Sequence, residues 1–167
     1  MKPWRAPAVG EAWWSPGRAA AAGLIAALVN SAAIRITRMA GIDGGTSGLS
    51  KWSLAHLNHA LGTALPTMLG PAGQEIFHTA IGIVSALIYA ALFYRMLPGP
   101  RWSRGVLYSQ AMWIAQALVI LPWLGKGYFG AGISPSAPFW SWALNALFGL
   151  AVGVLYLPAS KARAGSH

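Results

Sequence analysis

The sequence predicts an all-α fold, an integral membrane four-helix bundle with one extra interfacial helix, as a single membrane domain over residues 1–167. Of its 167 residues, 56% are hydrophobic and only 9% are charged, with 12 Lys and Arg against 3 Asp and Glu. A soluble domain carries roughly 25% charged residues. Four stretches also approach the roughly 20 apolar residues that a bilayer core requires of a helix. These observations together predict a polytopic membrane protein.

Four membrane spans are predicted from the apolar stretches, over residues of about 19–36, 75–97, 105–124 and 139–157. The first span is the weakest of the four, because it is rich in alanine and contains Asn30, Ser31 and Arg35. Arg18, an apolar run and small residues near Asn30 also resemble the outline of a signal peptide. Whether the first span is retained is therefore left open, and the other three spans predict a membrane protein in either case.

A fifth, shorter helix is predicted between the first two spans, over residues of about 52–65. Its apolar residues recur at helical spacing, while His56 and His59 belong to its polar face. The segment is too short and too polar to span a bilayer, so we expect it to lie in the interface. Pro66 closes it in this interpretation.

The distribution of basic residues predicts the orientation of the spans. Eight Lys and Arg residues fall on the side that holds both termini and the 98–104 connection, against four on the other side. Both termini are therefore predicted to be cytoplasmic, in a bacterial inner membrane. The charge is scattered over the connections rather than gathered on one face, which favours lipid headgroups over nucleic acid as its partner.

An internal repeat relates the second and fourth spans. A polar residue, two small residues and a tyrosine occupy relative positions 0, 4, 8 and 11 in both: His78, Gly82, Ala86 and Tyr89, then Asn145, Gly149, Gly153 and Tyr156. These positions share one helix face, where small residues allow close helix packing in a membrane. A duplicated two-helix hairpin is the simplest explanation.

The same motifs resemble a family of small bacterial and archaeal four-helix membrane proteins of uncharacterised function, and distantly the YagU family. The resemblance covers residues of about 23–156. It rests on His78, Gly82, Tyr89, Ala90, Arg104, Gly105, Pro122, Gly125, Gly127, Gly149, Gly153 and Tyr156. It implies a four-helix architecture and a second histidine near the start of the fourth span, where this chain has Asn145. A haem or metal held by paired histidines would lack that ligand here.

The leading candidate ligands are Glu75 and His78, one helical turn apart, with the similarly spaced His56 and His59. A carboxylate three residues from a histidine is the spacing used by metal sites in helix bundles, and a fold-back of the short helix would complete a site for zinc or another divalent ion. The structural alternative is that Glu75 complements the helix dipole, His56 and His59 face water, and His78 bonds to a neighbouring helix.

Other polar residues within the spans are candidates for structural or functional roles, because polar groups in a membrane are costly. Arg35 either snorkels to the interface or forms an ion pair with Glu75. Gln110 and Gln116, facing Asn30 or Asn145, would form an interhelical hydrogen-bond network.

The sequence favours a non-enzymatic accessory or structural subunit that packs against other membrane helices or against itself. Three carboxylates and no cysteine leave few catalytic groups, and the small-residue faces suggest helix partners. The first interpretation is that the protein binds no cofactor. The alternative is a small protein that binds a divalent metal, haem or pigment, or a small-solute transporter, using Glu75, His78, His56 and His59.

Overall fold

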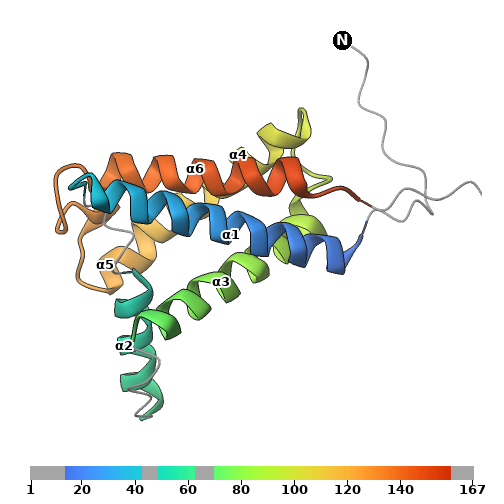
Figure 1. Ribbon diagram of the computed structural model, residues 1–167. Helices are drawn as coiled ribbons and strands as arrows, with labels where there is room; N and C mark the ends of the chain where they lie inside the picture. The colour runs from blue at the N-terminus through green and yellow to red at the C-terminus, as the bar shows by residue number, and fades with distance from the viewer. Residues whose placement is uncertain (1–13, 43–48, 63–69, 159–167) are drawn as a thin grey trace, which may run out of the picture.

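The computed structural model describes residues 14–42, 49–62 and 70–158, and these ranges are helical with no strand. Four helices are long and apolar enough to cross a bilayer, which confirms the predicted all-α membrane bundle. They are α1 (Pro16–Met39), α3 (Pro71–Ile88) with its π-helical extension η3 (Tyr89–Phe93), α4 (Arg101–Ala115) with η4 (Gln116–Ile120) and α5 (Leu121–Trp123), and α6 (Ala137–Leu155) (Figure 1). Large apolar side chains are exposed on all four, as lipid contact requires.

Prolines determine where the long helices begin. α1 and α3 start at Pro16 and Pro71, and α4 starts at Arg101 directly after Pro100. Proline suits the first turn because its missing N–H has no partner there in any case. Hydropathy placed the starts of α3 and α4 at 75 and 105, because it leaves out the polar first turn.

The short helix α2 (Leu49–Leu61) begins and ends earlier than the predicted 52–65. Gly62 ends it, with a φ of +61° that glycine adopts readily, and residues 63–65 lie outside the described residues. α2 runs across the long axis of α1 and α6, as expected of a helix in the interface (Figure 1). Lys126 holds it to the bundle by lying 4.2 Å from the centre of the Trp52 ring.

The long helices form an uneven bundle. α1 packs against both α3 and α6, and α6 packs against α4, whereas α3 meets α4 chiefly through η3. Both described ends of the chain lie at one end of the bundle, opposite α2 (Figure 1). There the Arg18 guanidinium donates to the carbonyl oxygens of Leu157 and Pro158, at 3.3 and 3.2 Å.

Small residues bring the backbones of α1 and α3 into contact. A Cβ atom added to Gly23 would lie 2.7 Å from the Cβ of Ala86 and 2.8 Å from the Gly82 carbonyl oxygen. A Cβ added to Gly82 would lie 2.7 Å from the Cβ of Ala27. The two helices therefore meet at a site with no room for a larger side chain.

The same arrangement recurs between α4 and α6. A Cβ added to Gly105 would collide with the Gly149 carbonyl and lie 2.7 Å from the Cα of Gly153, and one added to Gly149 would collide with Ser109. In each hairpin, a glycine and a small residue four positions later on the first helix meet two small residues four positions apart on the second. This match is what the predicted duplication of a two-helix hairpin requires.

The repeated tyrosines meet at the end of the bundle that holds the described termini. Tyr89 and Tyr156 are both fully buried, and their ring centres lie 6.2 Å apart. Tyr94 and Tyr108 pack against this pair, and Arg104 lies over the Tyr94 ring at 5.3 Å. Equivalent residues of the two hairpins are thus in mutual contact, as they would be beside a pseudo-twofold axis.

The two hairpins differ at the opposite end. α4 and α6 remain joined there, because the Trp113 indole N–H donates to the Ser141 hydroxyl at 3.0 Å. α1 and α3 splay apart toward α2 (Figure 1). The repeat is therefore closed in the second hairpin and open in the first.

We predict that Gly105→Ala destabilises the protein by about 1–3 kcal/mol, because the new methyl group must separate α4 from α6. The measurement is the free energy of unfolding in detergent, followed by circular dichroism.

Gly17→Ala is the matched control. It lies in α1 with no atom within 4 Å of an added Cβ, and it should leave stability unchanged or slightly raised. Equal stability of the two variants would contradict the proposed backbone contact.

Candidate functional site

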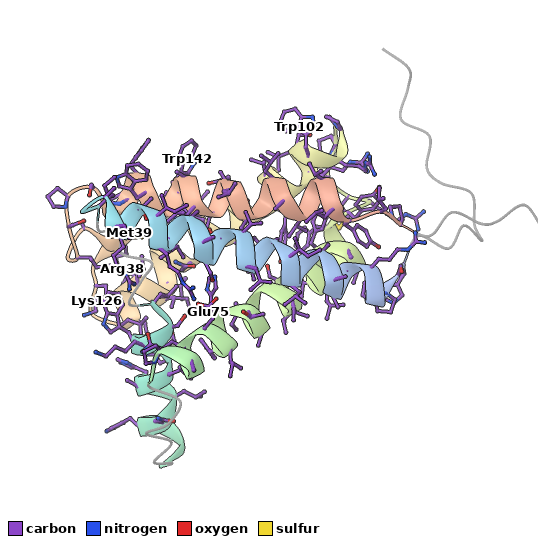
Figure 2. The ribbon with its side chains drawn as sticks, in the orientation of Figure 1. Arg38, Met39, Glu75, Trp102, Lys126 and Trp142 are labelled. Atoms are coloured by element: carbon purple, nitrogen blue, oxygen red, sulfur yellow. The ribbon has the colours of Figure 1, made fainter. Side chains whose placement is uncertain are left out.

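The splayed end of the α1–α3 hairpin holds a pocket of about 160 Å³, which α2 borders on the third side. Its walls are mostly polar: Ser31, Ile34, Arg35, Arg38, Ser50, Pro71, Gln74, Glu75 and His78. We call these residues the α1–α3 pocket. Figure 2 shows Arg38 and Glu75 near the end of the bundle where α2 joins α3.

Helical periodicity places these side chains on facing surfaces. On α1, Ser31, Arg35 and Arg38 follow one another at spacings of four and three, so they form one face of its last turns. On α3, Glu75 and His78 lie one turn apart in the first two turns. The antiparallel packing of the two helices brings both faces to the same end of the bundle.

An ion pair crosses the open end of the hairpin. An Arg35 guanidinium nitrogen lies 3.2 Å from a Glu75 carboxylate oxygen, as one of the sequence alternatives proposed. Ser31 also lines the pocket beside this pair. Arg35 is 69% exposed, so the pair contributes only about 0.2–1 kcal/mol to stability. Its main effect is to orient Glu75 toward α1.

His78 lies deeper in the same pocket, on the side of α3 that faces α1. Its ring nitrogen Nε2 is buried and has no hydrogen-bond partner among the described residues. A buried polar atom without a partner is costly, because it loses its hydrogen bonds to water and gains none in the protein. The equivalent residue of the other hairpin, Asn145, instead donates to the Ser141 carbonyl at 2.9 Å.

His56 and His59 do not join Glu75 and His78. Both are exposed on α2, and neither lines the α1–α3 pocket. The His56 ring packs against Trp123, with centres 5.2 Å apart. Within the described residues, no three His, Asp or Glu side chains gather in a way that could hold a metal ion. The four-ligand set expected from the sequence is therefore not assembled in this part of the chain.

The predicted amide network is replaced by bonds to helix backbones. Gln110 donates to the Trp142 carbonyl at 3.4 Å, while the side-chain oxygens of Asn30 and Gln110 are buried with no partner in the described structure. Gln116 is half-buried at the start of η4. A second and shorter hydrogen bond between α4 and α6 runs from the Trp113 indole to the Ser141 hydroxyl, at 3.0 Å.

Among the polar residues of the α1–α3 pocket, Arg38, Ser50 and Gln74 were not candidate ligands in the sequence interpretation. Gln74 and Ser50 lie outside the predicted span and the predicted interfacial helix, each by one or two residues. Placing the helix starts at the prolines and at Leu49, rather than at the apolar windows, would have brought both into the first turns of helices.

Comparisons of this chain with known protein families, with curated proteins and with solved structures find no match. The resemblance to YagU-like proteins therefore stays a prediction.

We predict that Arg35→Ala and Glu75→Ala are coupled in a double-mutant cycle by about 0.5 kcal/mol, the range of exposed ion pairs. The measurement is the free energy of unfolding in detergent of the wild type, the two single variants and the double variant.

Arg38→Ala with Glu75→Ala is the control cycle, because no ion pair joins Arg38 to Glu75 in the described structure. Its coupling should be smaller, and equal coupling in both cycles would contradict the specific pairing.

Proposed function

We propose that this multi-pass membrane protein is a non-enzymatic binding protein whose ligand occupies the α1–α3 pocket. One observation carries the proposal: two hairpins with the same helix contacts differ at one end. The second hairpin is closed there by the uncharged side chains of Trp113 and Ser141, whereas the first opens around charged residues and His78. A duplicated unit that keeps its packing but gains charged groups at one end has a specific use for those groups.

The cost of these groups supports the same proposal. Charged side chains within membrane-spanning helices are expensive, and they usually mark sites of function. Glu75 is the only carboxylate side chain within the described ranges, and it lines this pocket. A purely structural hairpin would be satisfied by residues such as Ser141 and Asn145, as the second hairpin shows.

The accessory-subunit hypothesis stays a prediction with weaker support. It depended on small-residue faces that were available to other membrane helices. Gly23, Gly82, Ala86, Gly149 and Gly153 face one another within this chain, so these residues are not free to contact a partner. The orientation with both termini cytoplasmic in a bacterial inner membrane remains part of the proposal, on the basis of the basic residues.

The proposal predicts that protein purified from its own membrane retains a bound small molecule, which native mass spectrometry in mild detergent would detect. The double variant Arg35→Ala/Glu75→Ala should lose this molecule, because it removes the pair that crosses the pocket.

The matched control is Ser141→Ala/Asn145→Ala, which alters the corresponding end of the second hairpin and should retain the molecule. A stoichiometric protein partner with no small molecule would contradict the binding proposal and favour the accessory subunit. Equal loss from both double variants would also contradict it.

A further inference from the structure

Two helices begin at the α1–α3 pocket. Pro71 and Gln74 from the first turn of α3, and Ser50 from the first turn of α2, are among its walls. The N-cap residue of α3 is Gly70, which has no side chain to bond the free N–H groups of that turn. Helix N-termini carry partial positive charge and attract anions.

The arginines contribute an excess of positive charge. Arg35 is neutralised by Glu75 at 3.2 Å. The Arg38 guanidinium, by contrast, has no ion-pair or hydrogen-bond partner among the residues that the structure describes, although it lines the same pocket. The described ionised side chains of the pocket therefore sum to one positive charge, with His78 neutral.

Polar side chains lie beside this charge in the walls of the pocket. Among the described residues His78 Nε2 is buried and has no hydrogen-bond partner, and in the tautomer that carries a proton there it donates. Ser50 and Gln74 add a hydroxyl and an amide to the walls. A guanidinium, an imidazole N–H and a hydroxyl around a helix start form a donor set suited to the oxygens of a phosphate group.

A cation fits this site poorly. The Glu75 carboxylate is already engaged by Arg35, and a metal ion would have to displace this guanidinium and lie close to that of Arg38 as well. The cavity of about 160 Å³ is also below the roughly 300–1,000 Å³ typical of pockets for drug-sized molecules. A compact anionic group matches both its size and its charge.

We infer that the α1–α3 pocket binds a phosphate group, with Arg38, His78 and the start of α3 as its contacts and the Arg35–Glu75 pair as its wall. This inference rests on the proposed function and specifies the ligand's chemistry. The phosphate could belong to a lipid headgroup at the interface or to a water-borne compound, because both present the same oxygens.

The test is the thermal unfolding midpoint, Tm, of the full-length protein in an uncharged detergent. One series compares the Tm in sodium phosphate with the Tm in sodium chloride at matched ionic strength. A second series compares the Tm with added dioleoylphosphatidylglycerol with the Tm with added dioleoylphosphatidylcholine. A tenfold excess over the dissociation constant should raise Tm by about 3–6 °C. A rise with free phosphate identifies a water-borne ligand, and a rise with phosphatidylglycerol alone identifies a lipid headgroup.

Arg38→Gln should reduce the rise in Tm by at least half. Arg101→Gln is its matched control, because it removes one positive charge from an exposed side chain at the other end of the bundle and should leave the rise intact. His78→Asn, which copies the residue of the second hairpin, should also weaken the response and serves as a second variant if Arg38→Gln folds poorly.

No rise with either anion, or a rise that Arg38→Gln and Arg101→Gln reduce equally, would overturn the inference, since the latter reports only net charge. The outcome is separable from that of the proposed function. A neutral or cationic molecule that is retained by the wild type and lost from Arg35→Ala/Glu75→Ala would uphold the binding pocket while refuting its preference for phosphate.

Discussion

Direct backbone contact between paired helices is the constraint on which the rest of this structure depends. In a bilayer the lipid tails remove the hydrophobic drive for helix association, so helices must gain their attraction from close van der Waals packing. Glycines provide this packing in both hairpins. In the first, Gly23 packs against Gly82 and Ala86. In the second, Gly105 packs against Gly149 and Gly153. Once these contacts are fixed, they determine the positions of the polar and aromatic residues along the axis of the bundle.

The near-symmetry of the hairpins makes their differences informative. At the tyrosine end, equivalent residues pack together and the two hairpins are joined. At the other end, Trp113 and Ser141 close one hairpin, while Arg35 and Glu75 bridge the open mouth of the other. The α3–α4 boundary is correspondingly looser than the α1–α6 boundary, because α3 leans away from the bundle toward α2 (Figure 1).

Composition and helical spacing were sufficient to predict the spans and the repeated small-residue face, because both depend on residues close in sequence. The spacing of Glu75 and His78 likewise placed them on one face. The expected union with His56 and His59 depended on the direction in which α2 leaves the bundle, which is set by tertiary contacts such as that of Trp52 with Lys126. The hydropathy windows began α3 and α4 four residues late, because Pro71 and Pro100 rather than hydropathy determine these starts. The ion pair of Glu75 with Arg35 was among the sequence alternatives, because carboxylates are scarce in this chain.

The glycine contact in the first hairpin also acts as a fulcrum. Glycine surfaces meet without interlocking side chains, so α1 and α3 can change their crossing angle there at little steric cost. Arg35 is 12 residues beyond Gly23, which corresponds to a lever arm of about 18 Å. A rotation of about 5° would move the mouth of the hairpin by roughly 1.5 Å at that radius, enough to make or break a hydrogen bond. Small angular changes at the helix crossing are thus converted into larger displacements at the mouth of the pocket.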